Sequence, residues 1–270
     1  MDETIPPWRR ALSAAGRASL AAGRGAARGV AAAYRSVDPD VRRHLAQLPL
    51  MSYSLFSRRG RPVTALEPDG HAPLVFVHGL GGGPGDFGPM AWYLRRRGGR
   101  RRTYSVAFKA GQGLDGRAAS LAVFVREVLA ATGEERVDLV AHSLGGLAAR
   151  LAILEHDLGP SVRCLVTLGS PHGGTFYARL GNTALTRDLR PDGGRMRSLA
   201  AATLPDGLIA VSFWSRGDVV IIPPESAILP GSRAVETPNY THYGYLIHPS
   251  SWKAVLEVLE GIPGPEDHTR

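Results

Sequence analysis

Ser143 stands in the stretch VDLVAHSLGGLAARLAILEHDL, residues 137–158, where the hydrophobic pattern changes its period. The segment from Val137 to Ala141 is a nearly continuous apolar run, as in a buried strand. From Leu144 onward the apolar residues recur every three or four positions, which is typical of one helix face. The pattern therefore predicts that Ser143 lies on a sharp turn from a strand into a helix.

A serine on such a turn has the surroundings that a nucleophile needs. Its hydroxyl is a weak nucleophile at neutral pH, so it must be exposed, directed at a base and close to donors for the oxyanion that forms on attack. The helix N-terminus supplies free backbone N–H groups. Small residues at Ala141 and Gly145 allow the tight turn, and Gly146 allows close packing of helix on strand. These features predict a nucleophile elbow supported by Ala141, His142 and Gly145. The side chain of His142 is expected to point the opposite way from Ser143.

A second oxyanion donor is expected in the glycine-rich stretch VHGLGGGPGDF, residues 77–87. Glycine backbone brings an N–H close to a substrate carbonyl without side-chain interference. We assign the two donors to the backbone amides of Leu80 and Leu144, with Gly79 as loop support and His78 shaping the loop. A phosphate-binding loop is the alternative, but the Lys and Ser or Thr of a P-loop are absent and the spacing does not fit a dinucleotide fingerprint.

An acid and a histidine should follow the nucleophile in that order along the chain. Asp218 in WSRGDVVIIPPES comes just beyond a predicted strand, and NYTHYGYLIHPSSW supplies two histidines downstream of it. His248 precedes Pro249 at the start of a predicted helix, where a capping or surface role would explain it. His242 lies in the turn-prone loop before that helix and can reach Ser143, so we favour His242 as the base.

The remaining polar residues have simpler explanations. His172 in GSPHGGT is expected to brace the site, and Ser170 has no elbow after it. Asp188, Asp192 and Asp206 are expected to be solvated on an insertion. Because no His, Asp and Glu cluster has metal-ligand spacing, we expect no catalytic metal and no other cofactor.

Apolar strands and amphipathic segments alternate from Ala72 onward, which predicts an α/β fold with a mainly parallel sheet and helices on both faces. The expected strands are PLVFVHG, TYSVAF, VDLVAHS, RCLVTLGS and LIAVSFWS, with SRAVET as a sixth candidate. The expected helices span residues 87–97, 117–132, 144–157 and 250–259. In such sheets the working residues gather at the carboxyl ends of the strands. The segment 175–208 is the only candidate for a lid, and a short helix within it predicts a minimal one.

The positive charge is concentrated at the N-terminus. The chain has 270 residues and a net charge of +8, of which +7 falls before residue 64. We therefore expect a basic arm, residues 1–63, and one catalytic domain, residues 64–270. A second basic cluster, RRRGGRRR, occupies residues 95–102. Neither region interleaves aromatic residues or shows a nucleic-acid motif, so nucleic-acid binding is not expected. The single cysteine, Cys164, is expected in the core.

The arm has an arginine stripe. Its arginines at 10, 17, 24, 28 and 35 fall along one side of a helix, beside a weakly apolar surface. Such a helix fits peripheral contact with an anionic membrane or a transit peptide, whereas a solvated or partly disordered extension is the alternative. No secretory signal is evident, and the longest apolar stretches are shorter than the roughly 20 residues of a membrane-spanning helix. We expect a cytoplasmic or peripheral membrane protein.

With these motifs assembled, the chain from about Ala72 onward resembles the alpha/beta-hydrolases of the lipase type, close to the small class 2 bacterial lipases and related esterases. HGLGGGPGDF, AHSLGG, LGSPHGGT, GDVVIIP and THYGYL are similar in type and order to the motifs of that family. The resemblance implies Ser143 as nucleophile, His242 as base and Asp218 as acid. It implies cleavage of acyl esters or lipids through an acyl-enzyme. An acyltransferase or thioesterase with the same triad, and a noncatalytic binding protein on this fold, are the alternatives.

Overall fold

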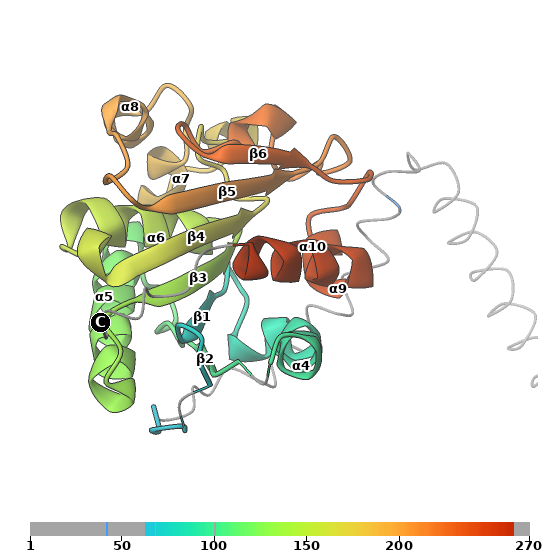
Figure 1. Ribbon diagram of the computed structural model, residues 1–270. Helices are drawn as coiled ribbons and strands as arrows, with labels where there is room; N and C mark the ends of the chain where they lie inside the picture. The colour runs from blue at the N-terminus through green and yellow to red at the C-terminus, as the bar shows by residue number, and fades with distance from the viewer. Residues whose placement is uncertain (1–41, 43–62, 68, 100, 262–270) are drawn as a thin grey trace, which may run out of the picture. The chain divides into compact units, whose positions relative to one another are not determined.

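Six strands form one parallel sheet in the computed structural model, which describes residues 42, 63–67, 69–99 and 101–261 (Figure 1). Their order across the sheet is β2-β1-β3-β4-β5-β6. The strands are β1 (Leu74–Val77), β2 (Thr103–Ser105), β3 (Val137–His142), β4 (Val162–Leu168), β5 (Ile209–Trp214) and β6 (Arg233–Glu236). Each coincides with a segment predicted as a strand, although β4 begins one residue earlier, at Val162. Every pairing is parallel, which confirms the α/β prediction.

The chain reverses direction across the sheet between β1 and β3. From β1 it moves outward to β2, then returns to β3 on the other side of β1 and continues to β6. The loops that leave the carboxyl ends of β1 and β3 therefore diverge and leave a crevice between them, as is usual for ligand sites in open parallel sheets. The topology alone thus directs the site to the ends of these two strands.

Helices cover both faces of the sheet (Figure 1). One core contains side chains of α5 (Leu114–Thr132) and α6 (Leu144–Glu155), and the other contains those of α4 (Gly88–Arg97) and α10 (Pro249–Glu260). Alternate residues of each strand enter opposite cores: in β1, for example, Val75 belongs to the first and Phe76 to the second. This two-sided burial explains why the strands are nearly continuous apolar runs. The other helices within the described ranges are η1 (Pro84–Phe87), η2 (Gly159–Ser161), η3 (Phe176–Leu180), α7 (Ala184–Asp188), α8 (Gly194–Ala201), η4 (Pro224–Ala227) and α9 (Gly244–Ile247).

The predicted lid segment between β4 and β5 contains three short helices, η3, α7 and α8, rather than one. Its last helix is attached to the elbow helix, because the buried Arg150 of α6 donates a hydrogen bond from Nη2 to the Leu199 carbonyl oxygen at 2.5 Å. Met196 and Leu199 also enter the core beside α6. The segment is therefore anchored in the domain through α8.

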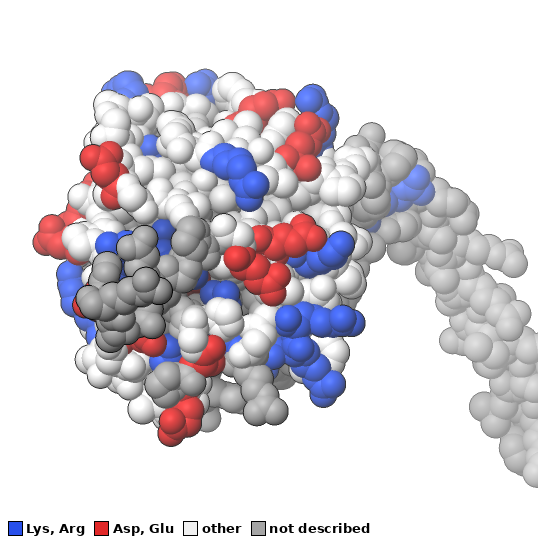
Figure 2. All heavy atoms as spheres, viewed as in Figure 1, with Lys and Arg blue, Asp and Glu red and all other residues white. Residues whose placement is uncertain are grey.

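The described arginines of the cluster RRRGGRRR divide into an exposed and a buried set: Arg95, Arg96 and Arg97 are exposed at the end of α4, whereas Arg101 and Arg102 are buried. Arg101 is buried and forms an ion pair with Asp138 of β3 at 2.9 Å, and Arg163 approaches the same carboxylate at 2.6 Å. Arg102 is also buried and pairs with Glu134 at 2.5 Å. Acidic and basic side chains are interspersed on the face shown in Figure 2. Two of the arginines that contribute to the positive net charge, Arg101 and Arg102, are thus buried and paired with carboxylates.

Asp138→Asn is expected to lower the free energy of unfolding by about 3–5 kcal/mol, because two arginines would lose the carboxylate that compensates their buried charge. Urea unfolding measures this effect. Glu236→Gln is the matched control, since Glu236 pairs with Arg216 at a surface where both side chains are largely exposed, and it is expected to cost about 1 kcal/mol or less. Equal losses in the two variants would contradict the role given to Asp138.

Several expectations concern residues that lie outside the described ones. The arginine stripe of the arm and its membrane contact belong to this group, so they stay predictions, as does the domain boundary at residue 63. Among the described residues, no helix is long and apolar enough to cross a membrane. Cys164 is fully buried, as expected for a core residue, and burial raises the pKa of its thiol to about 12.

Candidate active site

Ser143 connects β3 to α6 in a backbone conformation that is strained for any residue other than glycine. Its φ is 55° and its ψ is −129°. The corner is held by two hydrogen bonds, one from the Ser143 N–H to the Leu168 carbonyl oxygen at 3.0 Å and one from the Gly146 N–H to the Ser143 carbonyl oxygen at 3.0 Å. The turn predicted from the change in period is present, and the strain is concentrated on the serine itself.

Small residues make this corner possible. A Cβ on Gly145 would lie 2.3 Å from the Val77 carbonyl oxygen, and one on Gly79 would lie 2.9 Å from the Ser143 Cβ. A Cβ on Gly146 would lie 2.1 Å from the Ser170 Oγ. Since real Cβ atoms do not approach this closely, glycine is required where α6 meets the ends of the neighbouring strands.

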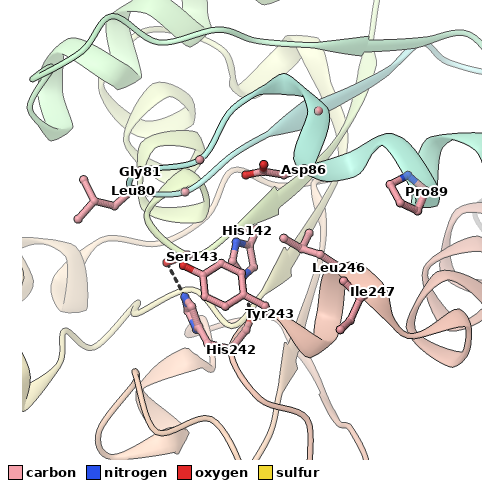
Figure 3. A pocket seen from close by; sticks show the side chains of 13 residues that line it. Leu80, Gly81, Asp86, Pro89, His142, Ser143, His242, Tyr243, Leu246 and Ile247 are labelled. Carbon is pink, nitrogen blue, oxygen red and sulfur yellow. Dashed lines mark hydrogen bonds between the residues drawn. The ribbon is translucent and has the colours of Figure 1, made fainter. Parts of the chain in front are cut away.

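The three side chains predicted to act together lie in one hydrogen-bonded row. His242 Nε2 is 2.9 Å from Ser143 Oγ (Figure 3). On its other side, His242 Nδ1 is 2.9 Å from Asp218 Oδ2. The other carboxylate oxygen of Asp218 accepts a hydrogen bond from the Val220 N–H at 3.0 Å. His242 and Asp218 are both buried, so the row is shielded from water along most of its length. Residues 143, 218 and 242 are thus brought together from three separate loops.

The competing histidine lies elsewhere. His248 stands at the start of α10, and its ring stacks on Tyr240 with a centroid separation of 4.8 Å. The other polar residues have the bracing positions expected for them: His172 Nε2 is 3.2 Å from Thr167 Oγ1, and His78 Nδ1 is 3.0 Å from the Gly79 carbonyl oxygen. Of the two candidate bases, the structure brings only His242 to Ser143.

The expected orientation of His142 is wrong. Strict alternation along a strand would place residues 142 and 143 on opposite faces, but the positive φ of Ser143 ends the alternation at the corner. Both side chains turn toward the loop that carries His242, and His142 Nε2 is 2.8 Å from the His242 carbonyl oxygen. His142 therefore lines the site instead of pointing away from it.

The two expected oxyanion donors flank the nucleophile. Leu80 directly follows Gly79, which packs against Ser143, and its side chain is 57% exposed. Leu144 is the first residue of α6, where an N–H has no carbonyl partner within the helix. Leu80 lies in the loop next to Ser143 (Figure 3). The oxyanion role of the two backbone amides stays a prediction.

A pocket opens beside Ser143 between the glycine-rich loop and α9 (Figure 3). Its lining is mainly apolar, with one carboxylate, that of Asp86, whose Oδ2 accepts a hydrogen bond from the Gly83 N–H at 3.1 Å. The lining residues are Gly79, Leu80, Gly81, Gly82, Gly85, Asp86, Pro89, His142, Ser143, His242, Tyr243, Leu246 and Ile247. The sequence analysis assigned no role to Asp86 or to the α9 residues, although both belong to the motifs it quoted.

Gly169 is another residue that the sequence analysis did not single out. It follows β4 with a φ of 53°, and a Cβ there would lie 2.6 Å from Tyr245 Cε2 and 2.9 Å from Asp218 Oδ2. A side chain at this position would displace the carboxylate. In the sequence, this role is indicated only by the motif LGSPHGGT, in which a glycine directly follows a predicted strand.

Two buried histidines are expected to make the fold sensitive to acid. Burial lowers the pKa of His142 to about 3 and that of His172 to about 3. These rings take up a proton near pH 6.5 in the unfolded chain but stay neutral in the folded one. Their contribution to the free energy of unfolding is therefore fully present above that pH. It falls by about 1.4 kcal/mol per pH unit for each ring as the pH drops toward 3. Urea unfolding at pH 7, 6 and 5 measures the slope. His172→Gln should have a shallower slope than the wild type, and identical slopes would contradict this assignment.

Among the described residues, no group of three or more His, Cys, Asp or Glu side chains is arranged to hold a metal ion.

Comparison with known proteins places this arrangement in a family. The family model described as "Alpha/beta hydrolase family" matches residues 74–259. A triacylglycerol lipase from Burkholderia plantarii is 33% identical over 157 residues, which cover 53% of this chain and 42% of that protein. The chain thus spans less than half the length of this curated relative. The family match confirms the resemblance indicated by the sequence motifs.

Two solved structures share the fold. Aspergillus fumigatus lipase B superposes with a TM-score of 0.65 at 17% identity, covering 77% of this chain and 57% of that protein. The mature form of Bacillus licheniformis lipase BlEst2 superposes with a TM-score of 0.59 at 21% identity, covering 74% of this chain and 96% of that one. At these identities the likeness concerns the fold.

Proposed function

Because this chain belongs to the alpha/beta hydrolase family, we propose that it is a serine carboxylester hydrolase, of the lipase or esterase kind, that cleaves acyl esters through an acyl-enzyme. The observation that carries the proposal is the unbroken row from Asp218 through His242 to Ser143, which ends at an apolar pocket. The name of the similar Burkholderia plantarii protein, a triacylglycerol lipase, supports an ester of a fatty acid as substrate.

The first step forms the acyl-enzyme. Ser143 Oγ attacks the ester carbonyl carbon while His242 Nε2 takes its proton, and Asp218 Oδ2 accepts the hydrogen bond from Nδ1–H and stabilises the resulting imidazolium. The tetrahedral oxyanion accepts hydrogen bonds from the Leu80 and Leu144 amides. When the intermediate collapses, the C–O bond to the alcohol breaks and His242 returns the proton to the leaving oxygen.

The second step releases the acid. Water gives a proton to His242 Nε2 and attacks the acyl carbon, and the same amides hold the second oxyanion. Collapse breaks the bond to Ser143 Oγ, which regains the proton from His242. The enzyme returns to its starting state, and one ester and one water yield one alcohol and one carboxylic acid.

The pocket indicates where the apolar part of the substrate lies. Leu80, Pro89, Leu246 and Ile247 line it beside the nucleophile and bury hydrocarbon at about 25 cal/mol for each Å² removed from water. An uncharged acyl chain gains this energy, whereas the carboxylate of Asp86 disfavours an anionic group there. The site therefore suits neutral esters with an aliphatic acyl group.

Labelling with a fluorophosphonate, followed by peptide mass spectrometry and product analysis, tests the proposal. We expect one covalent adduct on the peptide that carries Ser143, because the hydroxyl is activated by His242 in the folded site. The heat-unfolded chain is the control and should remain unlabelled. With an ester substrate the folded protein should release the free acid in water. No adduct on the folded chain would favour a binding protein, and transfer to an added thiol or alcohol in place of hydrolysis would favour an acyltransferase.

A further inference from the structure

Two consecutive residues of the elbow contact the same histidine. Ser143 Oγ lies 2.9 Å from His242 Nε2, and His142 Nε2 lies 2.8 Å from the His242 carbonyl oxygen (Figure 3). One contact reaches the ring and the other reaches the main chain. The elbow therefore holds both the imidazole and the backbone of His242.

The direction and state of the second contact follow from chemistry. A carbonyl oxygen only accepts hydrogen bonds, so His142 Nε2 carries the hydrogen and donates it. Only 3% of His142 is exposed, and this burial lowers its pKa to about 3, so the ring stays neutral at neutral pH with its single proton on Nε2. The ring centroids of His142 and His242 are 4.7 Å apart. A neutral neighbour at this distance does not repel the imidazolium that forms during catalysis.

The loop that carries His242 needs such a contact. His242 lies between β6 and α9, outside any helix or strand. Its imidazole must meet Asp218 on one side and Ser143 on the other, and a shift of about 1 Å in a reacting group can cost on the order of 100-fold in rate. A hydrogen bond from His142, the residue next to the nucleophile, fixes the position of the loop backbone relative to Ser143.

We propose that His142 is a positioning residue, whose Nε2–H holds the main chain of His242 so that its imidazole bridges Ser143 and Asp218. The inference rests on the proposed function, since it concerns the alignment of the base with the nucleophile. His142 does not exchange protons in the reaction. Its hydrogen bond fixes the distance between the elbow and the loop that carries His242.

Three substitutions in the full chain test this role. His142→Gln places an amide N–H at nearly the position of Nε2, whereas His142→Asn is one methylene shorter and does not reach the carbonyl. His142→Phe keeps the ring and removes the donor. We expect the Asn and Phe variants to lose about 10- to 100-fold in kcat with little change in KM, and the Gln variant to recover most of the loss.

A spectroscopic readout separates alignment from general destabilisation. The Nδ1–H of His242, held by Asp218, should give a low-field proton resonance that stays sharp in the wild type and the Gln variant and broadens in the Asn and Phe variants. The unfolding midpoint is measured for each protein. Wild-type kcat and a sharp resonance in either the Asn or the Phe variant would overturn the proposal, as would a Gln variant that behaves like the Asn variant.

The same experiment separates this inference from the proposed function. If Ser143→Ala is inactive but His142→Asn is as fast as the wild type, the positioning role fails and the hydrolase mechanism stands. If Ser143→Ala hydrolyses esters as fast as the wild type, the proposed mechanism fails. The resonance of the His242 Nδ1–H then still reports whether His142 aligns the ring, because it is measured without substrate.

Discussion

Ser143→Ala is expected to lower kcat for p-nitrophenyl esters by about 10⁵-fold, because the acyl-enzyme requires the Oγ that His242 deprotonates. Some residual rate should remain, since the amides of Leu80 and Leu144 can still stabilise an oxyanion when water attacks. The measurement uses esters from acetate to palmitate, so the wild-type profile also shows which acyl length the pocket prefers.

The control for this variant is a second serine at a strand end. Ser170→Ala removes a buried hydroxyl that packs against Gly146 of the same helix, yet Ser170 lies outside the row that includes His242. It is expected to keep nearly full activity. Both variants should unfold at similar temperatures, since alanine can occupy either backbone position. Comparable activity of Ser143→Ala and the wild type would exclude Ser143 as the nucleophile.

Asp218→Asn is expected to lower kcat by about 10³- to 10⁴-fold while KM changes little. The carboxylate accepts a hydrogen bond from His242 Nδ1 and so fixes the tautomer in which Nε2 is the free base toward Ser143. An asparagine amide of the same shape can donate to Nδ1 instead, which places the ring proton on Nε2 and removes the base. Steady-state kinetics with one ester over a range of concentrations separates kcat from KM.

Asp192→Asn is the matched control for the acid. Asp192 forms an ion pair with Arg179 at 3.1 Å, and both side chains are more than half exposed. Its substitution should leave kcat within about twofold of the wild type, because an exposed pair contributes roughly 0–1 kcal/mol to stability and lies outside the row of Asp218. If the two aspartates gave equal losses, the effect could not be assigned to the tautomer of His242.

The fold and most of the candidate site were accessible from local patterns. The strands of a parallel sheet are buried on both faces, so they are visible as short apolar runs, and the change of period at Ser143 shows where strand meets helix. The rule that sites lie at the carboxyl ends of strands then indicated Asp218, and the turn-prone loop before the last helix indicated His242. The order of nucleophile, acid and base along the chain supplied the rest.

Contacts between residues far apart in the chain could not be predicted from such local patterns. His142 was expected to face away from the nucleophile because alternation is a property of a regular strand, and the strained φ of Ser143 breaks it. Gly169 is marked in the sequence only as a glycine directly after a strand, and its role comes from Tyr245 of α9 and Asp218 of the loop after β5. The cluster RRRGGRRR does not show which of its arginines are buried, because Arg101 pairs with Asp138, more than thirty residues away in the chain.

The sequence by itself determined the elements and their order, since hydrophobic period and turn chemistry act between residues close along the chain. It also determined which residue types stand at the strand ends, and therefore which chemistry the site can perform. The tertiary structure alone decided the pocket, the orientation of His142 and the burial of Arg101. These features depend on contacts between side chains of separate segments, which meet only when the sheet assembles. Such contacts produce no periodic pattern in the sequence, so they cannot be recognised there.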